Sequence, residues 1–437
     1  MKWLIAIVFL LANLGFSAEN SAWTKESPRD EIAPLFEKTD DKNLKLTAQK
    51  KGTNGYWKRV FAVEGGKNYQ FQTTRFATGI EHPRRSCVVR IEWYGPNGQR
   101  VESPHKINPA YFGKDTGPAQ PDFPRDKKTN KDGSVLVEEI YEAPEKATEA
   151  HVQLHLRWTE AGSVLWKNVN LVPASPVKPR LVKLAAVHHN MASDNDKKSP
   201  VVNRELLVPL IEEAAKKKAD LIVLGELLTC KNVTSDYASV AESIPGPTTK
   251  FFGELAKKHD CYIVAGLAER AGHEVFNVAV LLGPDGKVTG KYRKVTLPRE
   301  EIQKGISPGT DYPVFETRFG KIGLMVCYDV FFPEVARELS MNGAEIIALP
   351  IWGGNPRLAA ARCAENGVYL VSSTYTNHEN DWMKTAIWNR EGDRISEANE
   401  WGTIAFAEVD LNQPTYWYGL GDFQARIKRE APVRISE

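Results

Sequence analysis

The sequence predicts two domains, an all-β domain followed by an α/β domain. Short segments of alternating apolar and polar residues fill the first part of the chain, and beyond residue 180 strands alternate with helices. The 437 residues exceed what one hydrophobic core usually holds, and 42% hydrophobic and 26% charged residues are ordinary for a soluble protein. Both observations favour two separate cores.

The first residues have the pattern of a signal peptide. Lys2 precedes an apolar stretch from Leu4 to Phe16, and the small residues Ser17 and Ala18 follow. A bilayer span needs about 20 apolar residues, and neither this stretch nor any later segment is long enough. We predict a signal peptide over residues 1–18 and a secreted or periplasmic protein without a membrane span after cleavage. An uncleaved membrane anchor is the alternative.

Residues 19–172 are predicted to form a β-sandwich accessory domain. Turn residues at 64–67 and 95–98 separate its short strands, while 103–133 has the composition of a surface loop. The expected strands cover residues 57–63, 69–74, 87–94, 134–141, 151–158 and 164–171. In one of them alternation divides two faces, with Val152, Leu154, Leu156 and Trp158 on one and Gln153, His155 and Arg157 on the other.

The end of this domain, residues 162–171, resembles the jelly-roll domains attached to secreted carbohydrate-active enzymes. The resemblance implies a jelly-roll-like sandwich that could bind a glycan, which requires exposed aromatic faces. The candidates are Trp57, Trp93, Trp158 and Trp166. Alternation places Trp158 beside Leu154 and Leu156, so core packing is the favoured interpretation. A spacer or an oligomer contact is an equal alternative for the domain.

The proline-rich segment 173–180 is predicted to be the linker, because its prolines lack donors and restrict their neighbours. The second domain, residues 181–437, shows an α/β pattern. Its expected strands cover residues 181–187, 221–224, 262–267, 276–282, 288–292, 322–327, 345–349, 369–373 and 404–409, and its expected helices 204–217, 248–258, 333–340 and 356–365. The tail from residue 412 could reach a neighbouring chain or be a solvated end.

Net charge and cysteine content argue against several classes of partner and site. The net charge of +2 indicates neither a nucleic acid nor an anionic membrane as partner. The five cysteines, an odd number, show no CxxC or Cys/His spacing, which argues against a disulfide framework and a zinc site. We therefore expect no metal and no cofactor. At least one thiol has no disulfide partner within the chain, and a free thiol in an exported protein suggests that this thiol has a chemical role.

Two polar groups follow apolar strands of the second domain. Glu226 ends the buried run 221–224, where it could be a functional carboxylate, a solvated loop residue or an N-cap. Lys294 lies in the basic stretch 290–298, which taken alone is more simply a solvated surface, since nothing local distinguishes it from Lys291.

A third strand ends in Cys327, and Pro333 opens the helix that follows. A thiol at such a strand-to-helix elbow is exposed, and backbone N–H groups, notably that of Tyr328, can stabilise an oxyanion. The alternative is a buried structural cysteine, since cysteines generally prefer interiors.

The three stretches, in this order and spacing, resemble the nitrilase superfamily of carbon–nitrogen hydrolases. The specific element is the string Cys-Tyr-Asp-x-x-Phe-Pro-Glu-x-x-Arg from Cys327 to Arg337, supported by residues 307–315 and 362–371. The resemblance covers about residues 181–412. It implies an α-β-β-α sandwich and a Glu–Lys–Cys triad, which fall on Glu226, Lys294 and Cys327.

In this triad Glu226 would be the general base, and Lys294 would lower the thiol pKa and stabilise the oxyanion. The resemblance also implies a further glutamate that holds the lysine or the substrate, for which we choose Glu301, with Glu300 as competitor. Thr296 departs from the family pattern, because many relatives have histidine two residues after the lysine.

The expected reaction is hydrolysis of a small amide or carbamoyl compound through a cysteine thioester, with release of ammonia or an amine. Nitrile hydrolysis is a close alternative, and a non-catalytic glycan-binding protein is an alternative of another class. The expected rim of the site consists of Tyr328, Phe331, Trp352 and Asn377, with core or surface packing as the alternative for each. The resemblance also implies a homo-oligomer.

Overall fold

The computed structural model describes residues 22–39, 43–108, 113, 115–191, 198–377, 379 and 382–432. The predicted signal peptide, residues 1–18, lies outside them. The chain divides into two compact units, one made of the residues up to Pro176 together with Tyr418–Gly421, the other of Val177–Trp417 and the residues from Asp422 on. No helix in the described part of the chain is long and apolar enough to cross a membrane.

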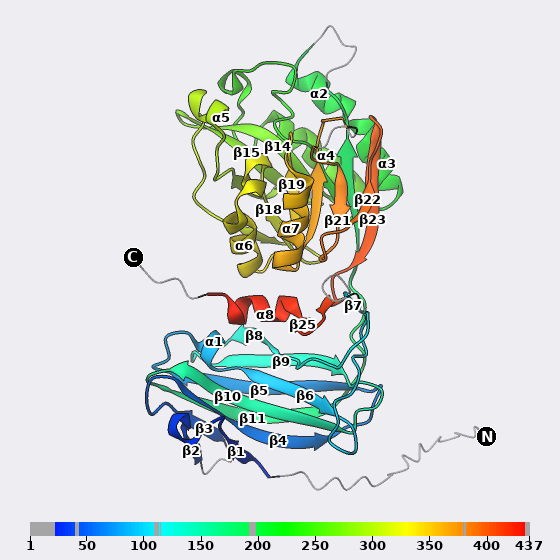
Figure 1. Cartoon of the computed structure of the whole chain (residues 1–437). Helices are drawn as coiled ribbons and strands as arrows, with labels where there is room; N and C mark the ends of the chain where they lie inside the picture. Colours follow the sequence, from blue (N-terminus) through cyan, green and yellow to red (C-terminus); the bar gives the residue numbers. More distant parts are fainter. Residues whose placement is uncertain are drawn as a thin grey trace, which may run out of the picture. The chain divides into compact units, whose positions relative to one another are not determined.

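The first unit is all-β, as predicted, and consists of two antiparallel sheets with the strand orders β1-β4-β10-β6 and β2-β3-β11-β5-β9-β8 (Figure 1). The strands are β1 (Thr24–Glu26), β2 (Leu35–Lys38), β3 (Leu44–Thr47), β4 (Thr53–Ala62), β5 (Asn68–Thr78), β6 (Val89–Tyr94), β8 (Arg125–Thr129), β9 (Val135–Glu142), β10 (Glu149–Thr159) and β11 (Ser163–Ala174). Short elements are η1 (Asp30–Ile32), α1 (Pro83–Ser86) and β7 (Ile107–Asn108). The jelly-roll likeness stays a prediction.

One core fills the space between these sheets. Trp57, Trp93 and Trp166 are buried in it, together with Phe71 and Leu154. The sequence did not predict β1, β2 and β3, which are short and include few alternating apolar residues. β11 also extends through Pro173 into the predicted linker, since β3 pairs only with its first residues and leaves one side of the strand open.

The prediction that Trp158 packs in the core is wrong, because its side chain is 52% exposed. The register of β10 against β4 shifts between Arg157 and Thr159, and Trp158 there has a left-handed φ of 58°. This bulge ends the alternation that the sequence predicts. Trp158 lies instead against the guanidinium group of Arg157, 3.9 Å from its ring centroid.

The second unit contains two six-stranded sheets with the orders β16-β15-β14-β13-β12-β23 and β17-β18-β19-β20-β21-β22. The first comprises β12 (Leu181–His188), β13 (Leu221–Val223), β14 (Tyr262–Ala271), β15 (Glu274–Leu282), β16 (Val288–Arg293) and β23 (Thr403–Asp410). The second comprises β17 (Val314–Glu316), β18 (Lys321–Leu324), β19 (Ile346–Pro350), β20 (Tyr369–Ser373), β21 (Ala386–Trp388) and β22 (Arg394–Glu397). The helices are α2 (Pro200–Leu206), α3 (Val208–Lys216), η3 (Tyr237–Val240), α4 (Pro247–His259), α5 (Arg299–Gln303), η4 (Cys327–Phe331), α6 (Pro333–Met341), α7 (Pro356–Asn366) and α8 (Phe423–Glu430).

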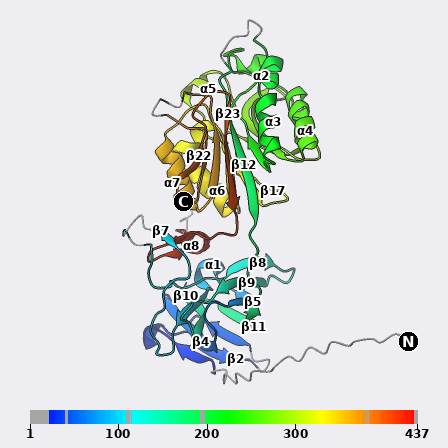
Figure 2. The same ribbon diagram turned by 90° about the vertical axis from the view of Figure 1, so that its right-hand side faces the viewer.

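Helices α3 and α4 cover the outer face of the first sheet, and α6 and α7 cover that of the second (Figure 2). One core lies between α3, α4 and the first sheet, where Ile211 and Phe252 meet Ile222. A larger core joins the facing sides of both sheets to α6 and α7 and includes Val223, Leu324 and Ala359. The resulting layer order is the α-β-β-α arrangement that the resemblance implies.

Two helical segments differ from their predictions. The helix predicted over residues 204–217 is divided at Leu207 into α2 and α3, since Pro209 has no N–H to donate to the preceding turn. The tail beyond residue 412 contains α8 and two short strands, β24 (Tyr416–Trp417) and β25 (Gly421–Asp422). Asp422 caps α8 by accepting a bond from the Ala425 N–H.

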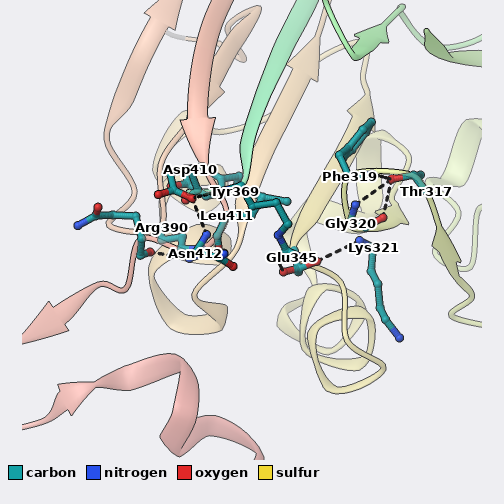
Figure 3. Close-up of polar contacts among 12 residues, drawn as sticks. Thr317, Phe319, Gly320, Lys321, Glu345, Tyr369, Arg390, Asp410, Leu411 and Asn412 are labelled. Carbon is teal, nitrogen blue, oxygen red and sulfur yellow. Dashed lines mark hydrogen bonds and ion pairs between the residues drawn. The ribbon is translucent and has the colours of Figure 1, made fainter. Parts of the chain in front are cut away.

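The parallel strands of the two sheets start at one end of the layers and finish at the other. At the end where β18, β19 and β20 begin, the chain forms turns with polar contacts (Figure 3). The Lys321 N–H donates to Glu345 at 3.1 Å, and the Tyr369 hydroxyl donates to the Asp410 carbonyl at 3.3 Å. The predicted site residues Glu226 and Cys327 follow β13 and β18 at the opposite end, where these strands finish.

Candidate active site

Glu226 is held at the end of β13 by the neighbouring strand β14. The Leu224 N–H donates to Val264 O at 2.8 Å, and the Gly266 N–H donates to Gly225 O at 3.1 Å. A Cβ on Gly266 would lie 2.6 Å from the Glu226 Cα, so this close approach requires glycine. Leu227 turns the chain with a left-handed φ of 46°. The Glu226 carboxylate is thereby 2% exposed.

Lys294 follows β16 and is completely buried. Its N–H donates to Asn277 O at 2.9 Å, which continues the ladder between β15 and β16 by one residue. Its ammonium group donates to Glu301 Oε1 at 2.9 Å and to Glu226 Oε1 at 3.2 Å. Burial lowers the pKa of Lys294, but the charges of Glu226 and Glu301 contribute to an opposing effect that raises this pKa above its ordinary value. Lys294 is therefore a fixed cation.

Glu301, and not Glu300, contacts Lys294. Both lie in the first turn of α5, but Glu301 is buried, whereas the Glu300 side chain is 65% exposed and pairs with Arg299. Burial and the nearby charge of Glu226 raise the pKa of Glu301, while Lys294 opposes this rise. The helical turn thus directs one of two adjacent glutamates inward and the other into solvent.

Asn277 joins the two buried carboxylates and was not predicted. Its amide nitrogen donates to Glu226 Oε1 at 2.8 Å and to Glu301 Oε1 at 2.9 Å. The side chain is 1% exposed and lies in the middle of β15. A polar residue inside the apolar run Val275–Leu282 was the signal that could have identified it.

Cys327 begins the 3₁₀ helix η4, three residues after β18 ends. The strand predicted over residues 322–327 is therefore shorter, and η4 lies between it and α6, the helix that Pro333 opens. Cys327 has a left-handed φ of 46°, a conformation that costs a residue other than glycine about 1 kcal/mol. Its Sγ lies 3.7 Å from Gly353 O and the residue is 9% exposed.

Two consecutive residues after β19 connect the carboxylate to the thiol. The Trp352 N–H donates to Glu226 Oε2 at 2.8 Å, and the next residue, Gly353, is the one that the Cys327 thiol contacts. The first bond joins Glu226, which follows β13 of the first sheet, to Trp352, which follows β19 of the second sheet. Glu226 and Cys327 are thus fixed against the same short segment.

Burial raises the pKa of the Cys327 thiol to about 12. The charge of Glu226 contributes to this rise and Lys294 opposes it. At neutral pH the resting thiol is consequently protonated, and a nucleophilic thiolate requires a base that accepts the proton during attack.

Asp329 is a second residue that the sequence did not single out. It is fully buried, and its Oδ2 accepts bonds from the Tyr292 hydroxyl at 2.8 Å and the Val326 N–H at 2.9 Å. Its Oδ1 accepts a bond from the Thr296 N–H at 3.0 Å. Asp329 therefore ties the residues around Lys294 to the residue before Cys327.

The expected rim residues lie in different surroundings. Tyr328 packs against Phe331 with ring centroids 5.3 Å apart. Phe331 is 39% and Trp352 56% exposed. Asn377 bonds within its own loop, where its Oδ1 accepts a bond from the Glu379 N–H. Trp352 contacts Glu226 through its backbone N–H.

All five cysteines are free thiols and buried. In the described part of the chain no three His, Cys, Asp or Glu side chains are grouped so that they could hold a metal ion. The predicted residues Glu226, Glu301 and Lys294 form polar contacts with one another and with Asn277, and the predicted Cys327 lies beside Gly353.

Comparisons with known proteins identify the family of the second unit. The family model "Carbon-nitrogen hydrolase" matches residues 183–418. A protein named nitrilase from Pyrococcus abyssi is 37% identical over 214 residues, which cover 46% of this chain and 81% of the relative. Omega-amidase NIT2 of Xenopus tropicalis is 29% identical, covering 54% and 90%, and a citrullinase of Francisella tularensis is 30% identical, covering 55% and 93%. The chain belongs to the carbon–nitrogen hydrolases of the nitrilase superfamily.

Proposed function

We propose that this protein hydrolyses a carbon–nitrogen bond of a small amide or carbamoyl compound through a thioester at Cys327. The observation that carries the proposal is the pair of contacts at Trp352 and Gly353, which hold the Glu226 carboxylate and the Cys327 thiol against one segment. Lys294, completely buried, supplies a positive charge beside both.

In the first half of the reaction Glu226 accepts the Sγ proton while the sulfur attacks the carbonyl carbon. The electron pair of the C=O bond moves to oxygen, and the oxyanion is stabilised by Lys294 and the Tyr328 N–H. The first N–H groups of a helix have no acceptor within it, so η4 can offer that donor. The C–N bond then breaks, and the proton on Glu226 passes to the leaving nitrogen.

The second half repeats these steps with water. Glu226 accepts a proton from a water molecule, whose oxygen attacks the thioester carbon, and the S–C bond then breaks as this proton passes from Glu226 to the sulfur. The products are a carboxylic or carbamic acid and the restored thiol. Glu301 and Asn277 do not reach the thiol in this scheme. They are positioning residues that hold Lys294 and Glu226.

Amide and carbamoyl substrates are our first choice because relatives are named omega-amidase and citrullinase. A nitrile is the alternative that a relative named nitrilase suggests. A nitrile carbon can accept the same attack, but complete hydrolysis to the acid consumes two waters and so requires one more hydration step.

The test is ammonia release from a panel of amides, carbamoyl compounds and nitriles by the wild type and by Cys327→Ala. We expect release from amides or carbamoyl compounds, and its loss in the variant. Intact-mass measurement after rapid acid quench should detect the acyl group on the wild type and none on the variant. Ammonia release that survives the substitution would exclude the mechanism, and release from nitriles alone would exclude the proposed substrate class.

Secretion and self-association complete the proposal. The sequence supports export through residues 1–18, and N-terminal sequencing of the mature protein should then begin after Ala18. Light scattering of the purified protein should give at least twice the mass of the chain. An intact N-terminus in the native cell, or a monomeric mass, would contradict the respective statement.

A further inference from the structure

Trp158 is the exposed member of the four tryptophans considered for glycan binding. Trp57, Trp93 and Trp166 are buried in the core between the two sheets of the first unit, whereas more than half of the Trp158 side chain is exposed. Exposure of a single aromatic residue is common and assigns no role by itself. The backbone and the surroundings of Trp158 are what distinguish it.

The backbone of Trp158 is strained in a way that places the indole in solvent. Trp158 lies in the bulge of β10 and has a left-handed φ of 58°, a conformation that is rare for a bulky residue and that glycine adopts at lower cost. Bulges of this kind change the direction of a side chain. Strained residues concentrate at sites that bind ligands, so a bulky, exposed residue in this conformation indicates a binding position.

Two loops of the first unit meet beside this indole. Residues 158–162 join β10 to β11, and residues 79–88, which include α1, join β5 to β6. A Cβ on Gly162 would lie 2.4 Å from Gly79 O, so the close approach of the two loops requires glycine. The His155 N–H also donates to Val88 O at 2.9 Å. The two loops are therefore fixed against each other through their backbones.

Each loop contributes an arginine beside the Trp158 ring. The guanidinium carbon of Arg157 lies 3.9 Å from the ring centroid, and that of Arg85 lies 5.4 Å from it. The Arg157 Nε donates to Arg85 O at 3.2 Å, which ties the two residues together. A guanidinium group beside an aromatic ring can still donate N–H bonds to a carboxylate or a sulfate. The indole and the two cations thus form one surface.

Arg85 has no carboxylate partner in the described part of the chain. The neighbouring Arg84 differs, because it lies 3.6 Å from the Asp126 carboxylate, which also pairs with Arg75 at 2.7 Å. An arginine that lies beside an exposed ring and lacks such a partner keeps its charge for an anionic ligand.

The flanking charges indicate which anion fits. Glu81 and Glu160 lie on the same two loops, and both side chains are exposed and pair only at the surface, with His82 and Lys51. These carboxylates oppose a chain that carries a phosphate on every unit, and the net charge of +2 gives no strong attraction for a nucleic acid. A sugar ring offers an apolar face to the indole and a single anionic group to an arginine.

We propose that Trp158, Arg85 and Arg157 bind a sugar ring of an acidic polysaccharide. The apolar face of the ring lies against the indole, and its carboxylate or sulfate accepts N–H bonds from Arg85. This binding activity goes beyond the proposed hydrolysis and does not depend on it. It gives the first unit a role of its own, which is to hold the protein on a polysaccharide.

The experiment compares polymers that differ only in charge, with the full-length protein and affinity electrophoresis. Polygalacturonate is paired with its methyl-esterified form and sulfated dextran with dextran, so that carboxylate and sulfate are tested separately. Poly-glutamate supplies charge without sugar, and poly(U) RNA supplies phosphate. We expect the wild type to bind at least one acidic polysaccharide about tenfold more tightly than its neutral partner, the value of one charge-assisted contact, and more tightly than poly-glutamate or RNA.

Two variants separate the sugar contact from the charge. Trp158→Ala should weaken binding of the favoured polysaccharide by about tenfold, and Trp158→Phe should retain part of the affinity. Arg85→Gln should reduce the preference for the acidic over the neutral polymer to near one. Arg85→Lys should restore only part of this preference, because lysine lacks the planar guanidinium group.

Trp401→Ala and Arg100→Gln are the matched controls. Trp401 is an exposed tryptophan of the second unit that stacks on His188. Arg100 is an exposed arginine of the first unit that pairs with Tyr94, beside the start of β10, whereas Trp158 lies near the end of that strand. Both controls should bind like the wild type, and thermal unfolding shows which variants remain folded.

The outcomes decide between the possible partners. Equal binding of acidic and neutral polymers, or no binding of any polysaccharide, would overturn the inference. Tighter binding of poly-glutamate or RNA would replace the sugar with a general polyanion. A folded Trp158→Ala or Arg85→Gln variant that binds like the wild type would also overturn it. Each of these results leaves the hydrolysis at Cys327 untouched.

Discussion

The hydroxyl of Thr296 donates a 2.5 Å hydrogen bond to the fully buried carboxylate of Asp329. Thr296 is two residues from Lys294 and Asp329 two residues from Cys327, so the bond links the segments of the cation and the thiol. The sequence raised Thr296 only as a departure from the family pattern. Its position shows how a threonine can occupy that place and satisfy a carboxylate whose pKa burial raises.

Thr296→Val should impair both stability and turnover. The substitution keeps the shape but removes one of the donors to Asp329, which costs about 1–3 kcal/mol of unfolding free energy for a buried acceptor. We expect urea unfolding at lower concentration and a lower kcat, because Lys294 is less firmly placed. Thr296→Ser keeps the hydroxyl and should retain most of both. Equal behaviour of the Val and Ser variants would contradict a role for the bond.

Glu226→Gln should abolish turnover and yet make Cys327 more reactive toward iodoacetamide. The charge of Glu226 raises the thiol pKa, so its removal lowers that pKa and increases the thiolate fraction at a given pH. In the wild type, with a thiol pKa of about 12, the rate should rise without a plateau from about pH 7 to about pH 10. In Glu226→Gln the alkylation rate should rise at lower pH than in the wild type. Peptide mapping identifies the labelled cysteine, and a profile at higher pH would refute the prediction.

Glu301→Gln should lower kcat by about a hundredfold with a smaller change in KM, because the charge that holds Lys294 is lost. Glu300→Gln is the matched control on the same helical turn, and its side chain is largely exposed. Steady-state kinetics of both variants measure the difference. Similar losses in the two would contradict the assignment of the positioning role to Glu301.

Lys218→Gly should stabilise the second unit modestly. Lys218 follows α3 with a left-handed φ of 59°, where glycine avoids about 1 kcal/mol of backbone strain, partly offset by its larger unfolded-state entropy. Lys216→Gly, two residues earlier inside α3, should destabilise by about 1 kcal/mol. Thermal unfolding of both variants gives the comparison. A change of the unfolding temperature in the same direction in both would be inconsistent with this explanation.

The sequence indicated Glu226, Lys294 and Cys327 because each follows an apolar strand and because Cys327 begins a specific string. It left Asn277 and Asp329 aside, since their roles depend on partners many residues away, in other elements. Periodicity predicted the strands of the first unit but failed at Trp158, because a bulge changes which face a residue occupies without a local signal. The choice between Glu300 and Glu301 likewise required the orientation of α5, which the neighbouring residues of the sequence do not indicate.

The triangle of Glu226, Lys294 and Glu301 has a consequence for the movement of charge. Before attack, the two carboxylates, the ammonium group and the neutral thiol sum to one negative charge. After attack, Glu226 is neutral, the oxyanion is negative, and the sum is unchanged. No net charge has to be created in the buried interior, where doing so is costly. The proposed reaction only moves the negative charge from one side of Lys294 to another.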